Sequence, residues 1–132
     1  MKIEAKKVVV NRSAEYVFDF FNDISNFKKL MPPNLSKFQV IDKDTFVFGL
    51  QGMPEIILKK KESVAPSKIV FGAANSPIDF ALSGHISPSG INSAEVQLSF
   101  EGKMNPMMSM MVKGPLTKLL GQFSDGLIQM FQ

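Results

Sequence analysis

The middle of the chain, from about Ser36 to Met104, alternates apolar and polar side chains with a period of two residues. The alternation falls into six runs, which read "KFQVID", "DTFVFGLQ", "EIILKKKE", "KIVFGA", "IDFALSGHIS" and "AEVQLSFEGK". This period is typical of β-strands with one buried face. The turn-forming stretches between the runs are too short for parallel crossovers, which need about a dozen residues or more. The sequence therefore predicts an antiparallel sheet with one apolar face that another element must cover.

Helical patterns flank the predicted sheet region, and the first of them follows a strand expected over roughly residues 2–10. Ser13 can cap a short helix whose apolar residues recur at helical spacing. A second short helix is expected over about 26–31, because Pro32 and Pro33 disfavour a helical conformation just before them. The order of elements is thus one strand, two short helices and then the six strands.

The C-terminal segment predicts one long helix, with Asn105 as its cap and Pro106 at its first position. From Pro106 to the end, such a helix would be about 40 Å long. Gly114-Pro115 interrupts the pattern, so we expect a kink there that lets the first half move as a gate. This helix is the predicted element long enough to cover the apolar face of the sheet, which gives an α+β fold class.

Composition excludes several classes of function. The 132 residues fit one domain and include no cysteine and one histidine. Strand parity places His85 with Asp79 and Ser83 on the polar face, opposite Phe80 and Leu82. With its one histidine facing solvent, we expect neither a histidine-dependent triad nor a typical zinc site. No glycine-rich phosphate loop is present either, so we expect no metal and no cofactor, and binding rather than catalysis.

Charge and hydropathy narrow the expected partners and location. The net charge is +3, and Arg12 is the only arginine, whereas proteins that read nucleic-acid bases favour arginine. We therefore expect no nucleic-acid partner. The apolar run near the N-terminus is too short for a signal peptide, and no stretch approaches the ~20 apolar residues of a membrane span. The expectation is a cytoplasmic protein without integral membrane association.

Four of the nine methionines lie within five positions at the start of the last helix, at Met107, Met108, Met110 and Met111. Methionine packs loosely and adapts to variable shapes. Because these residues make the first turns apolar around much of their circumference, we expect them to border a cavity. Contact with a partner protein, including a second copy of the chain, is the competing interpretation.

The stretch "NRSAEYVFDFFNDISNFKKLMPP" and the predicted order of elements resemble the START-related superfamily, which includes polyketide cyclases, pollen-allergen-like proteins and coenzyme Q-binding proteins. Members typically open with a strand, a small capping residue, an aliphatic residue followed by Phe, and an aspartate followed by spaced apolar residues and a proline. In this chain the features fall on Val10, Ser13, Val17-Phe18, Asp23, Phe27 and the run from Leu30 to Pro32. Leu30 and Met31 stand where many members carry tryptophan or tyrosine.

The resemblance implies the helix-grip fold, a seven-stranded antiparallel sheet wrapped around the long C-terminal helix with an elongated cavity between them. It also implies a hydrophobic ligand, because the superfamily includes lipid carriers, hormone receptors and cyclases. We expect a lipid-like or polycyclic small molecule in this cavity. Its apolar lining is expected to comprise Phe27, Met31, Phe46, Phe48, Leu58, Phe71, Phe80, Leu82, Leu98, Phe100, Met108, Met111, Val112, Leu116, Leu119 and Phe123.

Polar groups would orient such a ligand, and Gln51, Ser83 and Asn75 are the candidates. Two alternatives stay open. A cyclase- or dehydratase-like enzyme would need an inward-pointing His85 or an acid such as Asp125. A protein-interaction module, with a second copy of the chain or another protein as its partner, would instead use the methionines at the start of the last helix.

Overall fold

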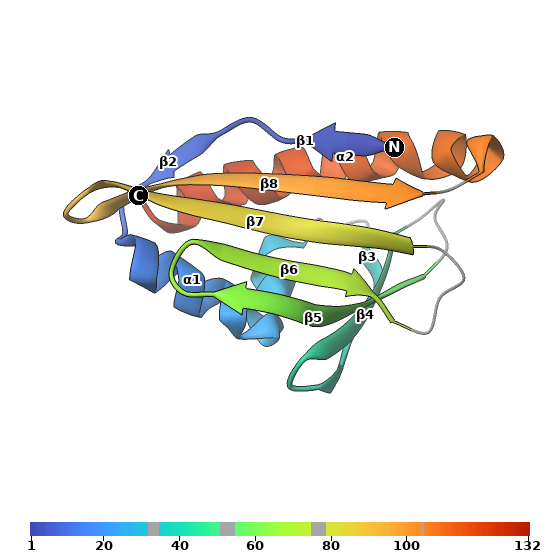
Figure 1. Ribbon diagram of the computed structural model, residues 1–132, viewed down its shortest axis with the longest axis horizontal. Coiled ribbons are helices and arrows are strands. Elements are labelled where there is room, and N and C mark those ends of the chain that lie inside the picture. Colours follow the sequence, from blue (N-terminus) through green and yellow to red (C-terminus); the bar gives the residue numbers. More distant parts are fainter. Residues whose placement is uncertain (32–34, 51–54, 75–78, 104) are drawn as a thin grey trace.

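The computed structural model describes residues 1–31, 35–50, 55–74, 79–103 and 105–132 (Figure 1). Two short strands precede a helix and a 3₁₀ helix; six strands and a long helix follow. Their bounds are β1 (Lys2–Glu4), β2 (Val8–Val10), α1 (Ala14–Asn22), η1 (Ile24–Leu30), β3 (Leu35–Asp42), β4 (Thr45–Leu50), β5 (Ile56–Val64), β6 (Lys68–Ala73), β7 (Asp79–Gly90), β8 (Ser93–Lys103) and α2 (Pro106–Met130).

The strands form one antiparallel sheet in the order β1-β8-β7-β6-β5-β4-β3. The first strand expected from the sequence is split, because β1 and β2 are separate segments that both pair with β8. Between them, Ala5 donates its amide hydrogen to the Leu98 carbonyl, and the Gln97 side chain donates to the Ala5 carbonyl. The sheet therefore has eight strand segments in seven positions, which confirms the expected helix-grip architecture.

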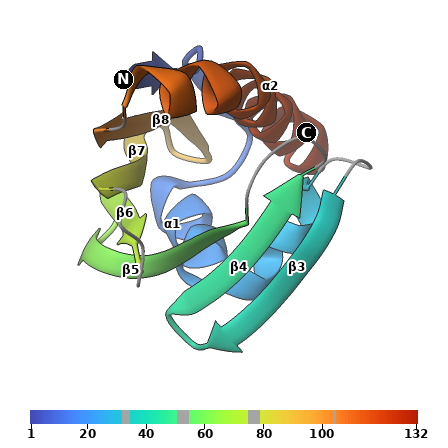
Figure 2. The same ribbon diagram turned by 90° about the vertical axis from the view of Figure 1, so that its right-hand side faces the viewer.

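The sheet curls, and α2 lies across the opening between its two ends (Figure 2). The helix α1 sits at the end of the molecule where α2 finishes, so that α2 begins at the opposite end (Figure 1). Buried apolar residues from α1, η1, α2 and the inward faces of the strands form one continuous core. The interior thus lies between the concave side of the sheet and the last helix.

The expected helix starts are confirmed by their caps. Ser13 Oγ accepts a hydrogen bond from the Tyr16 amide at 3.2 Å, and Asn105 Oδ1 accepts one from the Met108 amide at 2.8 Å. These side chains satisfy amide hydrogens that have no partner within the first turn of a helix.

The last helix continues through Pro115, and it is the single long helix that the sequence predicts. Proline removes one backbone hydrogen bond and crowds the preceding turn. Val112 and Leu116, on either side of Pro115, are both buried. We attribute the continuity of the helix to this packing, which outweighs the local preference of proline.

The two-residue alternation of β7 is confirmed by burial. Phe80, Leu82 and Ile86 face the core, and Asp79 and His85 are exposed. The pairing of β7 with β8 runs without a register shift past Gly84, so no bulge turns the following histidine inward.

Candidate functional site

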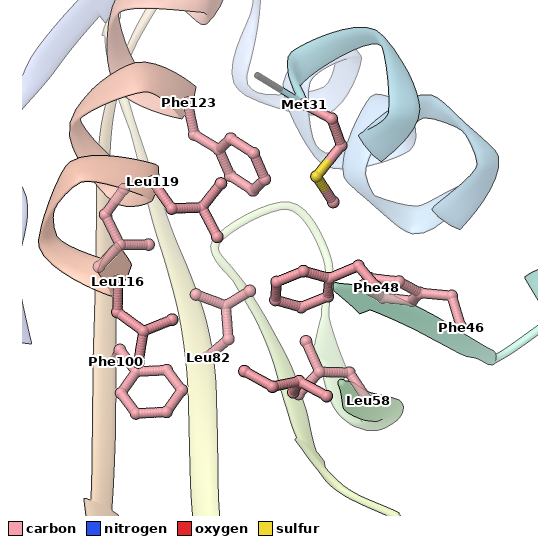
Figure 3. Close-up of a pocket in the computed structure, with 11 residues that line it drawn as sticks. Met31, Phe46, Phe48, Leu58, Leu82, Phe100, Leu116, Leu119 and Phe123 are labelled. Carbon is pink, nitrogen blue, oxygen red and sulfur yellow. The ribbon is translucent and has the colours of Figure 1, made fainter. Parts of the chain in front are cut away.

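A small void lies between the sheet and α2, and side chains from six elements converge on it (Figure 3). Met31 approaches from the end of η1, and three leucines and one phenylalanine approach from α2. The complete lining is Met31, Phe46, Phe48, Ile56, Leu58, Leu82, Phe100, Leu116, Leu119, Leu120 and Phe123. Each strand contributes residues from its inward face, so the site follows directly from the alternation seen in the sequence.

The lining of this void is entirely apolar, and the Met31 thioether is its most polarisable and flexible group. The free volume is about 10 Å³, roughly the room that one water molecule needs. Sites for drug-sized ligands are typically ~300 Å³ or larger. The interior is therefore closed in this conformation, and a guest larger than a water molecule would have to displace side chains.

A second void of about 10 Å³ lies nearer to α1. Its lining is Phe21, Phe27, Ile69, Phe71, Leu82, Ser83, Gly84, Leu98 and Phe123. Leu82 and Phe123 line both voids, one from the sheet and one from α2. These two side chains therefore form a common wall, and their displacement would join the two spaces.

Phenylalanine rings pack closely around both voids. Phe27 stacks on Phe46 with ring centroids 5.2 Å apart, and it meets Phe71 edge-to-face at 5.3 Å. Phe21 and Phe123 lie 5.6 Å and 6.1 Å from the same ring. Such geometries are favourable for aromatic pairs. Phe27, from the short η1 helix, thus lies at the centre of the aromatic cluster together with Phe46.

The structure brings most of the residues expected from the sequence to one of the two voids. Of the predicted lining residues, Phe27, Phe71 and Leu98 line only the second void. Four predicted residues line neither void, and all the remaining ones line the first. The exceptions are Phe80, which stacks on Phe100 at 5.5 Å, the buried Val112, the half-buried Met108, and Met111, which is half exposed.

Sequence reasoning missed Phe21, Ile56, Ile69 and Leu120 as lining residues. Three of them carried a usable signal. Ile56 and Ile69 each lie two residues before a predicted lining residue of the same strand, so they share its face. Leu120 lies one helical turn after Leu116. Phe21 belongs to α1, and its approach to the second void depends on how that helix packs, which periodicity does not reveal.

The polar candidates lie mostly away from the voids. Ser83 borders the second void, whereas Gln51 and Asn75 lie outside the described residues. His85 is exposed, as the sequence predicts. Asp125 is also exposed, and its carboxylate lies 3.0 Å from the Lys6 ammonium. The void linings therefore include no carboxylate or imidazole within the described parts of the chain, nor do those parts hold a cluster of three or more potential metal ligands.

The methionines at the start of α2 differ most from expectation. Met107, Met110 and Met111 are 75%, 83% and 50% exposed, and they line neither void. Met108 alone of the four packs against the core. The prediction that these methionines border a cavity is therefore wrong for Met107, Met110 and Met111, because their side chains lie on the side of the helix away from the sheet.

Comparison with known proteins identifies the fold. Neither a protein-family sequence model nor a curated protein sequence matches the chain. Norcoclaurine synthase from Thalictrum flavum, in complex with dopamine and hydroxybenzaldehyde, is similar in structure, with a TM-score of 0.75, 16% identity and coverage of 98% of this chain and 85% of that one. A START superfamily protein from Mycobacterium smegmatis gives a TM-score of 0.70, 15% identity and 99% coverage of both chains.

A hypothetical protein from Helicobacter pylori is also similar, with a TM-score of 0.73, 12% identity and coverage of 100% of this chain and 88% of that one. At these identities the likeness concerns the fold, and it shows a START-like helix-grip fold over the length of the chain. None of the helices in the described ranges has the length and apolar character needed to cross a membrane.

Proposed function

We propose that this START-like helix-grip domain binds an apolar small molecule between the sheet and α2, and that it acts as a binding or carrier protein. The observation that carries the proposal is the pair of apolar voids with a common wall, beneath the last helix. Buried apolar surface contributes roughly 25 cal/mol per Å² to affinity. A guest that fills the joined voids would therefore gain its affinity from contact area.

The lining favours a hydrocarbon or polycyclic aromatic guest. Phenyl rings and branched aliphatic groups surround both voids, and the one polar residue in their described linings, Ser83, lies on the outward-facing register of β7. A polar group placed in such surroundings would lose its hydrogen bonds to water without replacement. The bound part of the ligand is therefore apolar, and any polar group on it would remain at the rim.

Binding requires the interior to open, because each void now has room for about one water molecule. Leu82 and Phe123 are the side chains whose movement joins the voids. Cores are densely packed, so opening has a free-energy cost that lowers the apparent affinity. The structure of norcoclaurine synthase with dopamine and hydroxybenzaldehyde supports the proposal, since that protein of similar fold holds small aromatic molecules.

An enzymatic function has less support. A cyclase-like reaction needs a group that can transfer a proton at the substrate. His85 faces solvent on the outer side of the sheet, and Asp125 is held at the surface by Lys6. The described linings supply neither an acid nor a base, so we favour binding over catalysis.

The proposal can be tested by titrating purified protein with a panel of long-chain hydrocarbons and polycyclic aromatic compounds while following thermal stability, and by native mass spectrometry of freshly purified protein. We expect at least one compound class to raise the melting temperature. Ile56→Phe should fill the first void and weaken binding roughly tenfold or more, because added volume in a closed site must displace its neighbours.

Ile57→Phe is the matched control, since Ile57 is the next residue of the same strand and points to the opposite face. This variant should bind like the wild type. The proposal is overturned if no compound co-purifies and none in the panel stabilises the protein, or if both variants bind as tightly as the wild type.

A further inference from the structure

The first turns of α2 have two apolar faces. Val112 and Leu116 are buried against the core, whereas Met107, Met110 and Met111 are exposed. The exposed methionines occur at i, i+3 and i+4, so they share one face of the helix. At 100° per residue this face is opposite the buried one. We call these three side chains the methionine face.

The methionine face has no role in the interior site. None of its side chains lines either void, and half or more of each is accessible to solvent. The face is also small, because Met107 to Met111 span little more than one turn of the helix, about 6 Å of its length. Stable protein interfaces bury ~800 Å² on each partner. A lasting protein–protein contact would need much more surface than this face offers.

The charges near the methionine face are positive. Lys113 and Lys118 are exposed, and they are the charged residues of α2 before Asp125. Lys118 lies seven residues after Met111 and therefore continues the same face. Neither lysine takes part in an ion pair within the described ranges.

Acids near this end of the molecule have basic neighbours of their own, since Asp79 of β7 and Glu101 of β8 lie in one surface hollow with Lys2 and Lys103. Asp125 lies near the other end of the helix and is paired with Lys6 at 3.0 Å. In the adjacent strand β1, Glu4 is paired with Lys2 at 3.2 Å, so β1 adds no net charge. The start of α2 thus combines exposed apolar side chains with two lysines, Lys113 and Lys118, that form no ion pair within the described ranges.

The face is also well placed to meet a flat surface. In Figure 1 the first turns of α2 form the right-hand edge of the molecule, at the opposite end from α1. In Figure 2, which looks at that edge, the same turns lie in front along the top of the molecule. A planar partner could therefore reach the methionine face at this end of the molecule.

We propose that the methionine face docks on the surface of an anionic lipid bilayer. The thioether side chains enter the boundary between headgroups and acyl chains, and Lys113 and Lys118 contact lipid phosphates. Helices that lie on membranes combine apolar residues with lysines in this way, and lysines near an anionic leaflet are attracted to it. Flexible methionines suit a fluid surface that offers no fixed pocket. This inference goes beyond the proposed function and does not rest on it.

The test is sedimentation of the full chain with vesicles of phosphatidylcholine alone, or with about a third phosphatidylglycerol. We expect binding to the anionic vesicles that weakens as salt is raised. The triple variant M107Q/M110Q/M111Q and the double variant K113Q/K118Q should each bind about tenfold more weakly or worse. Glutamine keeps the helix propensity of methionine, so α2 should remain folded.

Matched controls use residues elsewhere on the surface. Ile41 and Ile91 are 53% and 93% exposed and lie in β3 and in the turn between β7 and β8. The variants I41Q/I91Q and K43Q/K59Q should bind vesicles like the wild type. Circular dichroism of every variant will show whether the fold is retained.

The inference would be overturned if the protein does not bind anionic vesicles, or if the methionine triple variant binds them as tightly as the wild type. It would also be overturned if the control variants lose as much vesicle binding as the methionine and lysine variants do. A concentration-dependent dimer that the triple variant abolishes, without vesicle binding, would assign the face to a second copy of the chain instead. Ligand-free protein is used throughout, so failure here leaves the proposed function untouched.

Discussion

Phe27 depends on polar contacts at the protein surface, although its ring lies in the centre of the core. It belongs to η1, and Asp23 caps this short helix. Asp23 Oδ1 accepts hydrogen bonds from the Ser25 amide at 3.2 Å and from the Ser25 hydroxyl at 2.7 Å. The Asn26 side chain also donates to the Phe20 carbonyl at 3.0 Å. These contacts fix the turn that directs Phe27 inward.

The pKa of Asp23 is lowered from its ordinary value of 3.8, first because the Ser25 hydroxyl donates to the carboxylate and next because the Ser25 amide does. A group whose pKa is lower in the folded state stabilises the fold above its unfolded pKa, and this stabilisation is lost as pH falls through the folded pKa. We therefore predict that Asp23→Ala lowers the melting temperature modestly at neutral pH. The difference from the wild type should shrink as pH falls below 3.8.

Thermal denaturation followed by circular dichroism at neutral and acidic pH checks this prediction. Ser25→Ala is the matched variant, because it removes the hydroxyl that lowers the pKa most. It should show a smaller effect with the same pH dependence. An equal loss at both pH values would mean that the carboxylate charge is irrelevant to the stability of η1.

Among the elements, the strands were predictable because alternation and turn residues agree, whereas the break between β1 and β2 was not. That break depends on β8, where the Gln97 side chain and the Leu98 carbonyl bond to Ala5 in place of a regular ladder. Hydrogen bonds between residues so far apart in the chain leave no local pattern in the sequence. The long helix α2 was predictable as well, because its Asn105 cap and its apolar stripe are local features of the sequence.

The glycines of α2 give a prediction about this element. A side chain added at Gly121 would meet no heavy atom within 4 Å, whereas one added at Gly126 would lie 3.2 Å from Leu30 Cδ2. Glycine within a helix costs roughly 0.5–1 kcal/mol relative to alanine. Gly121→Ala should therefore raise the free energy of unfolding by about that amount.

Gly126→Ala serves as the comparison and should gain less or lose stability, because Leu30 must move. Urea denaturation of both variants measures the difference. Equal gains would show that Leu30 yields without cost, and a destabilised Gly121→Ala would contradict the open surroundings of that position.

At the scale of the whole molecule, the site was largely predictable because one curved sheet brings the apolar faces of its strands together. The stripe through Met108, Val112 and Leu116 was predictable and faces the core, whereas the exposure of the other methionines was not. Methionines surround the first turns of α2, so periodicity could not show whether those off the stripe border a cavity or solvent. Which side chains are buried there depends on how the sheet and helix are placed against each other.

Leu82 offers a test of the whole interior, because it lines both voids. We predict that Leu82→Ala destabilises the protein by about 2–5 kcal/mol, as usual for a buried leucine. It should also bind benzene more tightly than the wild type does, since engineered apolar cavities accept such guests. Calorimetric titration and the shift in melting temperature with benzene measure the effect.

Leu127→Ala is the control, because Leu127 is fully buried in α2 but lines neither void. It should lose comparable stability. Benzene binding that is no stronger in Leu82→Ala than in this control would contradict a common wall between the voids.

The pairing of β1 and β2 with β8 has a consequence for synthesis on the ribosome. Val10 lies opposite Ala94, and Met1 and Gly102 exchange backbone hydrogen bonds of 2.8 and 2.9 Å. Because β1 and β2 precede β8 in the chain, they leave the exit tunnel before their partner has been translated. Non-local pairing of this kind slows folding. Until then the valines of β2 have no sheet to join, and unpaired apolar strands of this kind are prone to aggregation.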